Sequence, residues 1–404
     1  MLEHILIIVA VTGLLASTVF LGLVVFAAGR FRASAEYSPD WSAGKAFLPP
    51  VTILKPLHGM EPLLGECLES FFQLDYPAYE LIFGARSEFD PALAVVKSLK
   101  RKYPHIPTQT VLSGEPGYPN AKVYLMEKMV PLAAHSILVI TDSDVRVTRD
   151  YLKQLVQPMQ DANVGMITCL YRGVPTGGLW SLLEALGMSV EMSSGVLVAN
   201  LLEGMKFALG PSMVIRRDVL AAWGGFEVLR DYCADDFIMG ALTYEAGRTV
   251  VLSHHVIDHI VLNRSARQSL LHQIRWMKSS RFSRRLGHVG TGLTFAMPFG
   301  VLGFVAGWVS GNWALGLGLL GVALANRILQ ALAVGWGVTR DRNSALYCWL
   351  YPVRDLLGFV LWCGSFSGSE IVWRGERYRL VSGGRMVPKD RIAATGSNGR
   401  GLAV

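Results

Sequence analysis

The chain has 404 residues, of which 51% are hydrophobic and 17% charged, and it carries a formal net charge of +7. This composition is too apolar for a wholly soluble protein, so we expect membrane segments to account for the excess. The positive charge suits anionic lipid or anionic substrates, and because basic residues stand beside apolar segments we expect no nucleic-acid partner. The five cysteines are scattered without metal-binding spacing, which indicates reduced thiols in a cytosol-facing domain.

An apolar, charge-free run covers Ile5–Gly29 and is long enough to cross a bilayer. It is too long for the apolar region of a signal peptide, and no basic segment precedes it, so we expect a membrane anchor and not a cleaved signal. Arg30 and Arg32 follow the run. By the positive-inside rule, they place the next domain in the cytoplasm.

From residue 51 to residue 265, short apolar strands alternate with amphipathic helices, the pattern of an α/β domain with a mostly parallel, Rossmann-like sheet. No glycine-rich phosphate loop follows any strand, so phosphate binding would depend on a metal ion. The expected strands are 51–57, 79–85, 108–112, 137–141, 164–170, two pieces within 207–217, and 248–262. The expected helices are 62–74, 90–100, 121–134, 179–199 and 234–247.

Two carboxylates, Asp142 and Asp144, stand directly after the predicted strand 137–141. Ligands bind at the carboxyl edge of such sheets, and an Asp-x-Asp pair there offers oxygen ligands to one divalent cation while leaving room for phosphate oxygens. The arrangement predicts a nucleotide diphosphate as the ligand. The alternative is structural, with Asp142 starting a turn and Asp144 capping a helix that follows Thr148.

A second acidic pair, Asp235 and Asp236, opens the predicted helix 234–247. Stabilisation by the helix dipole explains one of these acids but not both. If the preceding loop brings this helix end to the edge that carries Asp142, one acid can act as general base towards an acceptor hydroxyl.

The segment 248–262 contains His254, His255, Asp258 and His259, which together have the composition of a metal site. Alternation along a strand puts His255 and His259 on one face and Asp258 on the other, so we expect a structural role. A supplementary metal ligand beside the diphosphate and a separate zinc site are the alternatives.

A helix predicted within 266–290 has an apolar face and a basic face. This pattern fits a helix that lies in the membrane interface, and it equally fits basic residues that snorkel before a membrane span.

Two apolar runs, Leu293–Val309 and Trp313–Val334, are each long enough to cross the membrane and return. The next run, 345–366, is interrupted by Arg354 and Asp355. A straight span would bury both charges and carry the basic tail outside, so we predict a re-entrant or interfacial helical pair with both charges near the polar surface. The alternative is a true span with the ion pair buried against other helices.

The chain therefore divides into an anchor, a linker, an α/β domain, an interfacial helix, a membrane region and a basic tail, expected over 1–32, 33–50, 51–265, 266–290, 291–368 and 369–404.

An ordered set of motifs runs through the chain: 51–74, Asp90-Pro91-Ala92, Asn120-Ala121-Lys122, DSDVRV from 142, ADDF from 234, HQIRW from 272 and WRGERYRL from 373. In order and spacing the set resembles the ceramide glucosyltransferases and the related hopanoid-biosynthesis glycosyltransferases. These enzymes form a membrane branch of the GT-A, family-2-like glycosyltransferases. The resemblance covers nearly the whole chain.

The resemblance implies a donor site formed by six residues, the sixth of which is His272. Asp90 resembles the acid that contacts the nucleotide base, and Asp142 and Asp144 resemble the acids that hold the metal ion and the diphosphate. Asn120 and Lys122 belong to a matching segment and are expected to bind the donor as well.

The resemblance also implies the residues of the reaction itself. Asp236 resembles the catalytic base, and Arg275 with Trp276 resembles the end of the (Q/R)xxRW motif. This chain departs from the family at His272, where the family has Gln or Arg. A histidine there can still donate one hydrogen bond towards the diphosphate.

The predicted activity is the inverting, metal-dependent transfer of one sugar, glucose or N-acetylglucosamine, from a UDP-sugar to a hydroxyl of a sphingoid or hopanoid membrane lipid. Mg²⁺ or Mn²⁺ would be the cofactor. We expect a multi-pass membrane protein, in the inner membrane if the source is a bacterium, with the catalytic domain on the cytoplasmic face. One alternative is a processive polysaccharide synthase, which would need more transmembrane helices. The other is an inactive membrane scaffold that binds nucleotide sugars.

Overall fold

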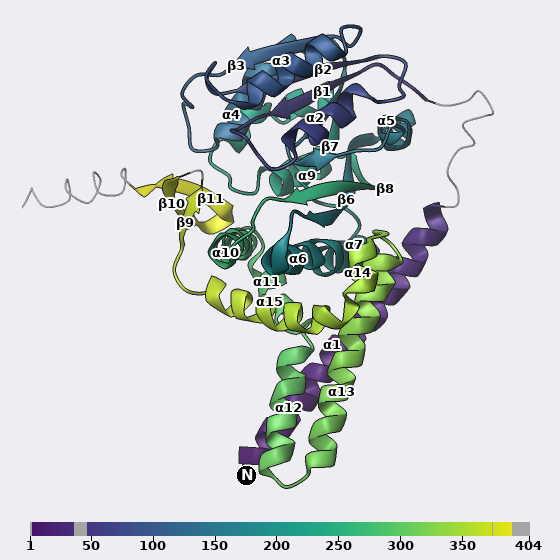
Figure 1. Ribbon diagram of the computed structural model, residues 1–404, viewed down its shortest axis with the longest axis vertical. Coiled ribbons are helices and arrows are strands. Elements are labelled where there is room, and N and C mark those ends of the chain that lie inside the picture. Colours follow the sequence, from purple (N-terminus) through teal and green to yellow (C-terminus); the bar gives the residue numbers. More distant parts are fainter. Residues whose placement is uncertain (1, 36–46, 374, 390–404) are drawn as a thin grey trace, which may run out of the picture.

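The protein is described by a computed structural model over residues 2–35, 47–373 and 375–389. An eight-stranded sheet with helices on both faces forms the upper part of the molecule in Figure 1, and three helices extend together from its lower side. The expected linker 33–50 falls largely on residues 36–46, which lie outside the described residues.

The central sheet has the strand order β3-β2-β1-β4-β7-β6-β8-β5. The pairs β3–β2, β2–β1, β1–β4 and β6–β8 are parallel, and the other three are antiparallel. The predicted α/β class with a mostly parallel sheet is therefore confirmed. The bounds are β1 Val51–Pro56, β2 Tyr79–Ala85, β3 Thr108–Leu112, β4 Ile137–Thr141, β5 Val145–Arg146, β6 Val164–Pro175, β7 Ser212–Arg216 and β8 Thr249–Val261.

Every residue of β1, β2 and β4 is buried, because helices cover both faces of this part of the sheet. Asp90 accepts a hydrogen bond from Ala92 N at 2.9 Å and so caps the following helix, as predicted. The helices around the sheet are α2 Leu64–Phe72, α3 Ala92–Lys102, α4 Ala121–Met129, α5 Tyr151–Leu155, α8 Arg217–Ala222 and α9 Asp235–Glu245.

Three sequence predictions need correction in this domain. Only Ser212–Arg216 forms a strand within 207–217, because Gly210 and Pro211 approach the acidic residues as a turn. The strand predicted over 164–170 continues to Pro175. The helix after Thr148 begins only at Tyr151, so Asp144 does not cap it.

A long apolar helical segment lies between the sheet and the membrane helices (Figure 1). It consists of α6 Gly178–Leu186, a π-helical stretch η4 Gly187–Met192, and α7 Ser193–Glu203. Its length and composition would allow a membrane span, but most of its surface is buried inside the protein.

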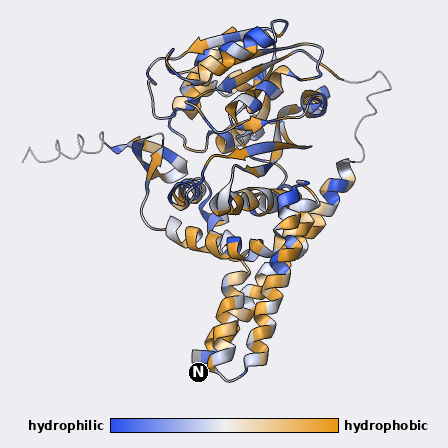
Figure 2. Ribbon diagram, viewed as in Figure 1, coloured by the Kyte–Doolittle hydropathy of each residue, from blue (hydrophilic) through white to orange (hydrophobic). Residues whose placement is uncertain are grey.

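Three helices form the extension in Figure 1: α1 Leu2–Ala35, α12 Met297–Val309 and α13 Trp313–Gln330. α13 continues through η6 Ala331–Trp336, and α1 and 313–336 are each long and apolar enough to cross a membrane. α12 has 13 residues, about 20 Å, which is shorter than the predicted span Leu293–Val309 and too short to cross a bilayer as a helix by itself. Hydrophobic residues dominate all three helices in Figure 2.

The short helix α14 Arg342–Leu346 leads to α15, which runs unbroken over Tyr351–Ser365 and lies crosswise to the three extended helices (Figure 1). The predicted break into two halves is therefore wrong, although 15 residues, about 22 Å, remain too few to cross. Arg354 and Asp355 are also not near the polar surface, because both are buried. Each of the two pairs with a residue of another helix, and they do not pair with each other.

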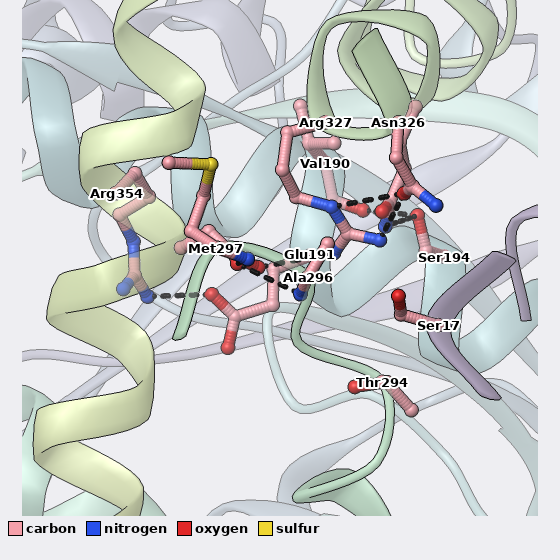
Figure 3. Close-up of polar contacts among 12 residues, drawn as sticks. Ser17, Val190, Glu191, Ser194, Thr294, Ala296, Met297, Asn326, Arg327 and Arg354 are labelled. Carbon is pink, nitrogen blue, oxygen red and sulfur yellow. Dashed lines mark hydrogen bonds and ion pairs between the residues drawn. The ribbon is translucent and has the colours of Figure 1, made fainter. Parts of the chain in front are cut away.

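Figure 3 shows these buried partners. Asp355 Oδ1 accepts a hydrogen bond from Arg327 Nη1 at 3.0 Å, while its Oδ2 accepts from Ala296 N and Met297 N at 3.0 and 2.8 Å. Backbone N–H groups at a helix start have no partner within the helix, so Asp355 caps α12 and pairs with α13 at once. Arg354 Nη2 lies 2.9 Å from Glu191 Oε2.

After α15 the chain forms a three-stranded antiparallel sheet from β9 Glu370–Trp373, β10 Glu376–Val381 and β11 Arg385–Pro388. This C-terminal sheet packs on the loop 231–233. Cys233 N donates to Gly384 O at 3.1 Å, and Met386 N donates to Asp231 O at 2.6 Å. Of the predicted basic tail, Arg374 and residues 390–404 lie outside the described residues.

The predicted amphipathic segment forms α10 Ala266–Ser283 and α11 Arg285–Thr291. Its basic residues bind protein groups: Lys278 Nζ donates to Glu370 O at 3.0 Å, and Arg281 donates to Ser365 O. The basic face of α10 thus fastens the start of the C-terminal sheet.

Candidate active site

The two predicted acidic pairs meet at one edge of the sheet. Asp142 N donates to Pro211 O at 3.2 Å, and Gly210 N donates to Asp236 Oδ2 at 2.7 Å. One turn therefore holds the acid after β4 and the acid at the start of α9. A side chain at Gly210 would place its Cβ 2.9 Å from Asp236 Oδ2, so a larger residue there would push the carboxylate away from the Gly210 N–H group.

Asp142 and Asp144 follow β4 as predicted, and basic groups hold the first of them. Lys122 Nζ lies 2.5 Å from Asp142 Oδ1, and Lys55 Nζ donates to Asp142 O at 2.7 Å. Asp144 Oδ1 is buried without a hydrogen-bond partner among the described residues, and His259 Nε2 is 3.7 Å away. An unpartnered carboxylate oxygen beside a second carboxylate fits a divalent cation.

Burial raises the pKa of Asp144, and the Asp142 carboxylate adds to the effect, while His259 opposes it. Burial alone would lower the pKa of Lys122, but Asp142 and Asp235 hold it above its usual value. The site thus keeps a charged ammonium close to Asp144 and Asp235, whose pKa values burial raises. A bound divalent cation, like the ammonium group of Lys122, would stabilise the ionised form of nearby carboxylates.

Two backbone N–H groups hold the Asp236 carboxylate. Its Oδ1 accepts from Phe237 N at 2.8 Å, in addition to the bond from Gly210. Burial raises its pKa to about 6, with the Asp235 carboxylate as the second cause, while Lys122 and the backbone donors lower it. A carboxylate with a pKa near the working pH is suited to proton abstraction.

The structure places Asp90 and Asn120 at the same edge, with protein partners. Both oxygens of Asp90 accept from Gly59 N, at 3.1 and 3.0 Å. Asn120 is buried: its Oδ1 caps α4 at Val123 N, and its Nδ2 donates to Tyr232 O at 2.9 Å. Asn120 thus anchors the loop that leads to Asp235.

α10 brings the remaining predicted residues together. Arg275 is half-buried beside Cys233, and its guanidinium lies 5.9 Å from the centre of the Trp373 ring. The rings of His272 and Trp276 are 4.3 Å apart. This turn of α10 therefore borders the loop that carries Asp235 and contacts the C-terminal sheet.

The histidine-rich stretch is split by a bulge in β8 between Ser253 and Val256. His255 Nδ1 lies 3.1 Å from Gln154 Oε1, whereas His259 stacks beside Tyr171 and approaches Asp144. Asp258 pairs with two arginines of neighbouring strands, Arg146 and Arg172. Within the described residues, no three His, Cys, Asp or Glu side chains are grouped as a metal site.

Sequence reasoning missed two buried charged residues, Lys55 and Glu184. Lys55 lies in the fully buried β1 with its ammonium 3.7 Å from the centre of the Phe71 ring, and burial lowers its pKa to about 8. Glu184 lies in the apolar α6 and accepts a hydrogen bond from His272. A single charge inside an otherwise apolar element was the available signal for both.

The fold is thus an α/β sheet whose edge gathers two acidic pairs and a buried lysine, joined to long apolar helices. The comparisons with known proteins identify its family. The model of glycosyl transferase family 21 matches residues 5–386, so the chain belongs to this family, and the resemblance predicted from the motifs is confirmed.

Individual relatives are more distant. Ceramide glucosyltransferase 1 of Caenorhabditis elegans is 25% identical over 377 residues, which cover 90% of this chain and 78% of the relative. A ceramide glucosyltransferase of Komagataella phaffii is 38% identical over 114 residues, covering 27% of this chain and 22% of the relative. Among solved structures, a mannosyltransferase of Pyrobaculum calidifontis has a TM-score of 0.49 and 17% identity over 87% of this chain and 99% of its own.

Proposed function

We propose that the protein transfers one hexose from a UDP-sugar to a hydroxyl of a membrane lipid, with inversion at the anomeric carbon. Relatives named ceramide glucosyltransferases support glucose and a sphingoid acceptor as the first pair to test. A hopanoid polyol and N-acetylglucosamine form the second pair. The observation that carries the proposal is the turn at Gly210 and Pro211, which binds Asp236 and Asp142 side by side.

One group of residues would bind the donor, and Asp236 would act on the acceptor. Asp142 and Asp144 would hold a Mg²⁺ or Mn²⁺ ion, which would neutralise the charge of the departing diphosphate. Lys122 adds a fixed positive charge at the same place. Arg275 and His272 of α10 would bind the diphosphate, and Asp90 would contact the nucleotide base.

Asp236 would remove the proton from the acceptor hydroxyl as the oxygen attacks the anomeric carbon on the face opposite to the diphosphate. The hydrogen bonds from Gly210 N and Phe237 N fix the orientation of the carboxylate without substrate. Because Gly210 binds Asp236 and the next residue, Pro211, binds the backbone of Asp142, the base and the metal ligands would lie close together around the sugar.

We further propose that the protein crosses the membrane more than once, with the catalytic domain on the cytoplasmic face. The ends of α12 and α13 that adjoin residues 310–312 lie at the same end of the bundle as the start of α1 (Figure 1). The lipid acceptor would then reach the site from the helices beneath the sheet, where α6, α10 and α15 meet.

The test is incubation of the purified protein with Mn²⁺, UDP-glucose or UDP-N-acetylglucosamine, and ceramide or a hopanoid polyol. UDP release and mass spectrometry of the lipid report transfer. Asp236→Asn should abolish transfer, a loss of about 10²–10⁴-fold, and leave donor binding largely intact. Asp142→Asn should weaken Mn²⁺-dependent donor binding itself, because a metal ligand acts in the ground state and the transition state alike.

Asp218→Asn is a matched control, since Asp218 is an exposed acid in the first turn of α8. It should behave like the unaltered protein in both assays. Near-normal turnover of Asp236→Asn would contradict the assignment of the base, and the absence of transfer with all four substrate pairs would contradict the proposed activity.

A further inference from the structure

Glu184 is a buried carboxylate that nothing described so far employs in catalysis. Its side chain is 1% exposed and accepts three hydrogen bonds. Ser269 Oγ and Asn263 Nδ2 donate at 2.5 and 2.9 Å, and His272 Nδ1 lies 2.8 Å from Glu184 Oε1. A buried charge with this many partners is held in one orientation.

Nδ1 of His272 has two close neighbours, Glu184 Oε1 at 2.8 Å and Asn263 Nδ2 at 3.0 Å. An ionised carboxylate only accepts hydrogen bonds, so the contact with Glu184 is a hydrogen bond when Nδ1 carries the hydrogen, and the contact with Asn263 is then not one. Asn263 Nδ2 donates to the same oxygen of Glu184, which orients the amide as well. Nε2 has no hydrogen-bond partner among the described residues, and the side chain of His272 keeps 26% of its surface exposed beside Trp276.

Two connections place this pair next to the metal-binding acids. Gly173 of β6 is paired with His259 of β8, and a Cβ on Gly173 would lie 2.5 Å from Ala185 Cα. The turn of α6 that carries Glu184 therefore packs against β6 and β8, close to the point where His259 approaches Asp144.

The second connection runs through the end of β8. Ile260 N donates to Asp144 O at 2.9 Å, and Asn263 follows Ile260 by three residues. An extended chain of that length spans at most about 10 Å. The amide that binds Glu184 is therefore within reach of the region where a metal-bound diphosphate would lie.

We propose that Glu184 is a positioning residue that aims His272 at the diphosphate of the nucleotide sugar. The inference rests on the proposed function, in which position 272 lies on the diphosphate side. With a hydrogen on each ring nitrogen, His272 would donate from Nδ1 to Glu184 and from Nε2 to a diphosphate oxygen, and Glu184 would balance the positive charge of the ring. In this chain a histidine that is paired with a carboxylate would make the hydrogen bond to the diphosphate. In the family, Gln or Arg makes it without such a partner.

The experiment is a double-mutant cycle read by binding of UDP in the presence of Mn²⁺, measured by calorimetry on the purified full-length protein. The variants are Glu184→Gln, His272→Gln and the double substitution. Glu203→Gln is the matched control, because Glu203 is an exposed glutamate at the end of α7. Thermal unfolding of each variant reports stability separately.

Glu184→Gln should weaken UDP binding about tenfold in the unaltered background, since a charge-assisted pair is lost. In the His272→Gln background, Glu184→Gln should change UDP binding less than about twofold, because a glutamine at position 272 does not depend on a paired carboxylate. An equal effect in both backgrounds would show that Glu184 acts through the fold, and no effect in either would show that it does not act on the donor. Both results overturn the inference.

Transfer to lipid separates this inference from the proposed function. UDP binding that follows the cycle, without transfer to any lipid, would refute the proposed acceptor and leave the role of Glu184 in place. Transfer with UDP binding that is insensitive to Glu184→Gln would refute the role of Glu184 alone.

Discussion

Replacing Asp235 with asparagine should move the acidic limb of the pH–rate profile to lower pH. Burial and the Asp235 carboxylate raise the pKa of Asp236 from 3.8 to about 6. Base catalysis needs the ionised form, so kcat/KM of the unaltered enzyme should rise with pH through about 6 and then level off. At pH 5 about one Asp236 carboxyl in ten is ionised, so kcat/KM there should be about a tenth of its plateau.

Asp235→Asn removes a negative charge next to Asp236, which makes ionisation of Asp236 easier and lowers its pKa. The pKa should stay above 3.8, because burial is the larger cause and remains. A fall of about one unit would bring kcat/KM at pH 5 to about half of its plateau. The plateau value of kcat/KM should change little, whereas the pH at which the acidic limb falls should shift.

UDP release at low substrate concentration, in buffers of constant ionic strength with saturating Mn²⁺, measures this profile. Saturating metal is needed so that the limb does not report metal loss. Asp218→Asn should leave the limb in place. If the limb of Asp235→Asn stays near 6 or moves to higher pH, then Asp236 is not the group that titrates, and the reasoning fails.

Further predictions concern the rest of the chain. His272→Gln should retain much of the transfer activity and His272→Ala should lose most of it, because glutamine still donates a hydrogen bond; equal activities would indicate a packing role. Asp355→Asn should destabilise the protein by about 3–5 kcal/mol, since it leaves the charge of Arg327, 2% exposed, without its charged partner. Adding Arg327→Met should recover most of that loss in thermal unfolding, whereas Glu370→Gln, in an exposed ion pair, should cost less than about 1 kcal/mol; a double variant as unstable as Asp355→Asn would contradict the buried pairing. A cysteine placed after Val381 should stay unlabelled by an impermeant reagent on intact cells, and labelling would mean that 345–366 crosses the membrane.

The strands and the acids were predictable because both have local signals. A strand covered on both faces is a continuous apolar run, as Ile137–Thr141 is, and carboxylates directly after such a run mark the ligand edge of the sheet. The capping role of Asp90 likewise follows from three adjacent residues. These features depend on neighbours in the sequence.

The features that were wrong or missed depend on partners far along the chain. Arg354 and Asp355 look like a break in an apolar run, but Glu191 and Arg327 accommodate them inside one continuous helix. The partner of Glu184 lies 88 residues away in α10. No local pattern reveals such pairs, because burying a charge is tolerable only when its distant partner arrives in the same place.

The docking of the C-terminal sheet has a consequence for the order in which the protein is completed during synthesis. When a ribosome has completed the chain up to α15, the large sheet and all the apolar helices exist, but the loop 231–233 still lacks the backbone partners that Gly384 and Met386 supply. That loop leads directly to Asp235 and Asp236. Strands that are translated after α15 therefore complete the support of the loop before Asp235 and Asp236, and a chain that stops after α15 is expected to hold this acidic pair less firmly than the longer chain.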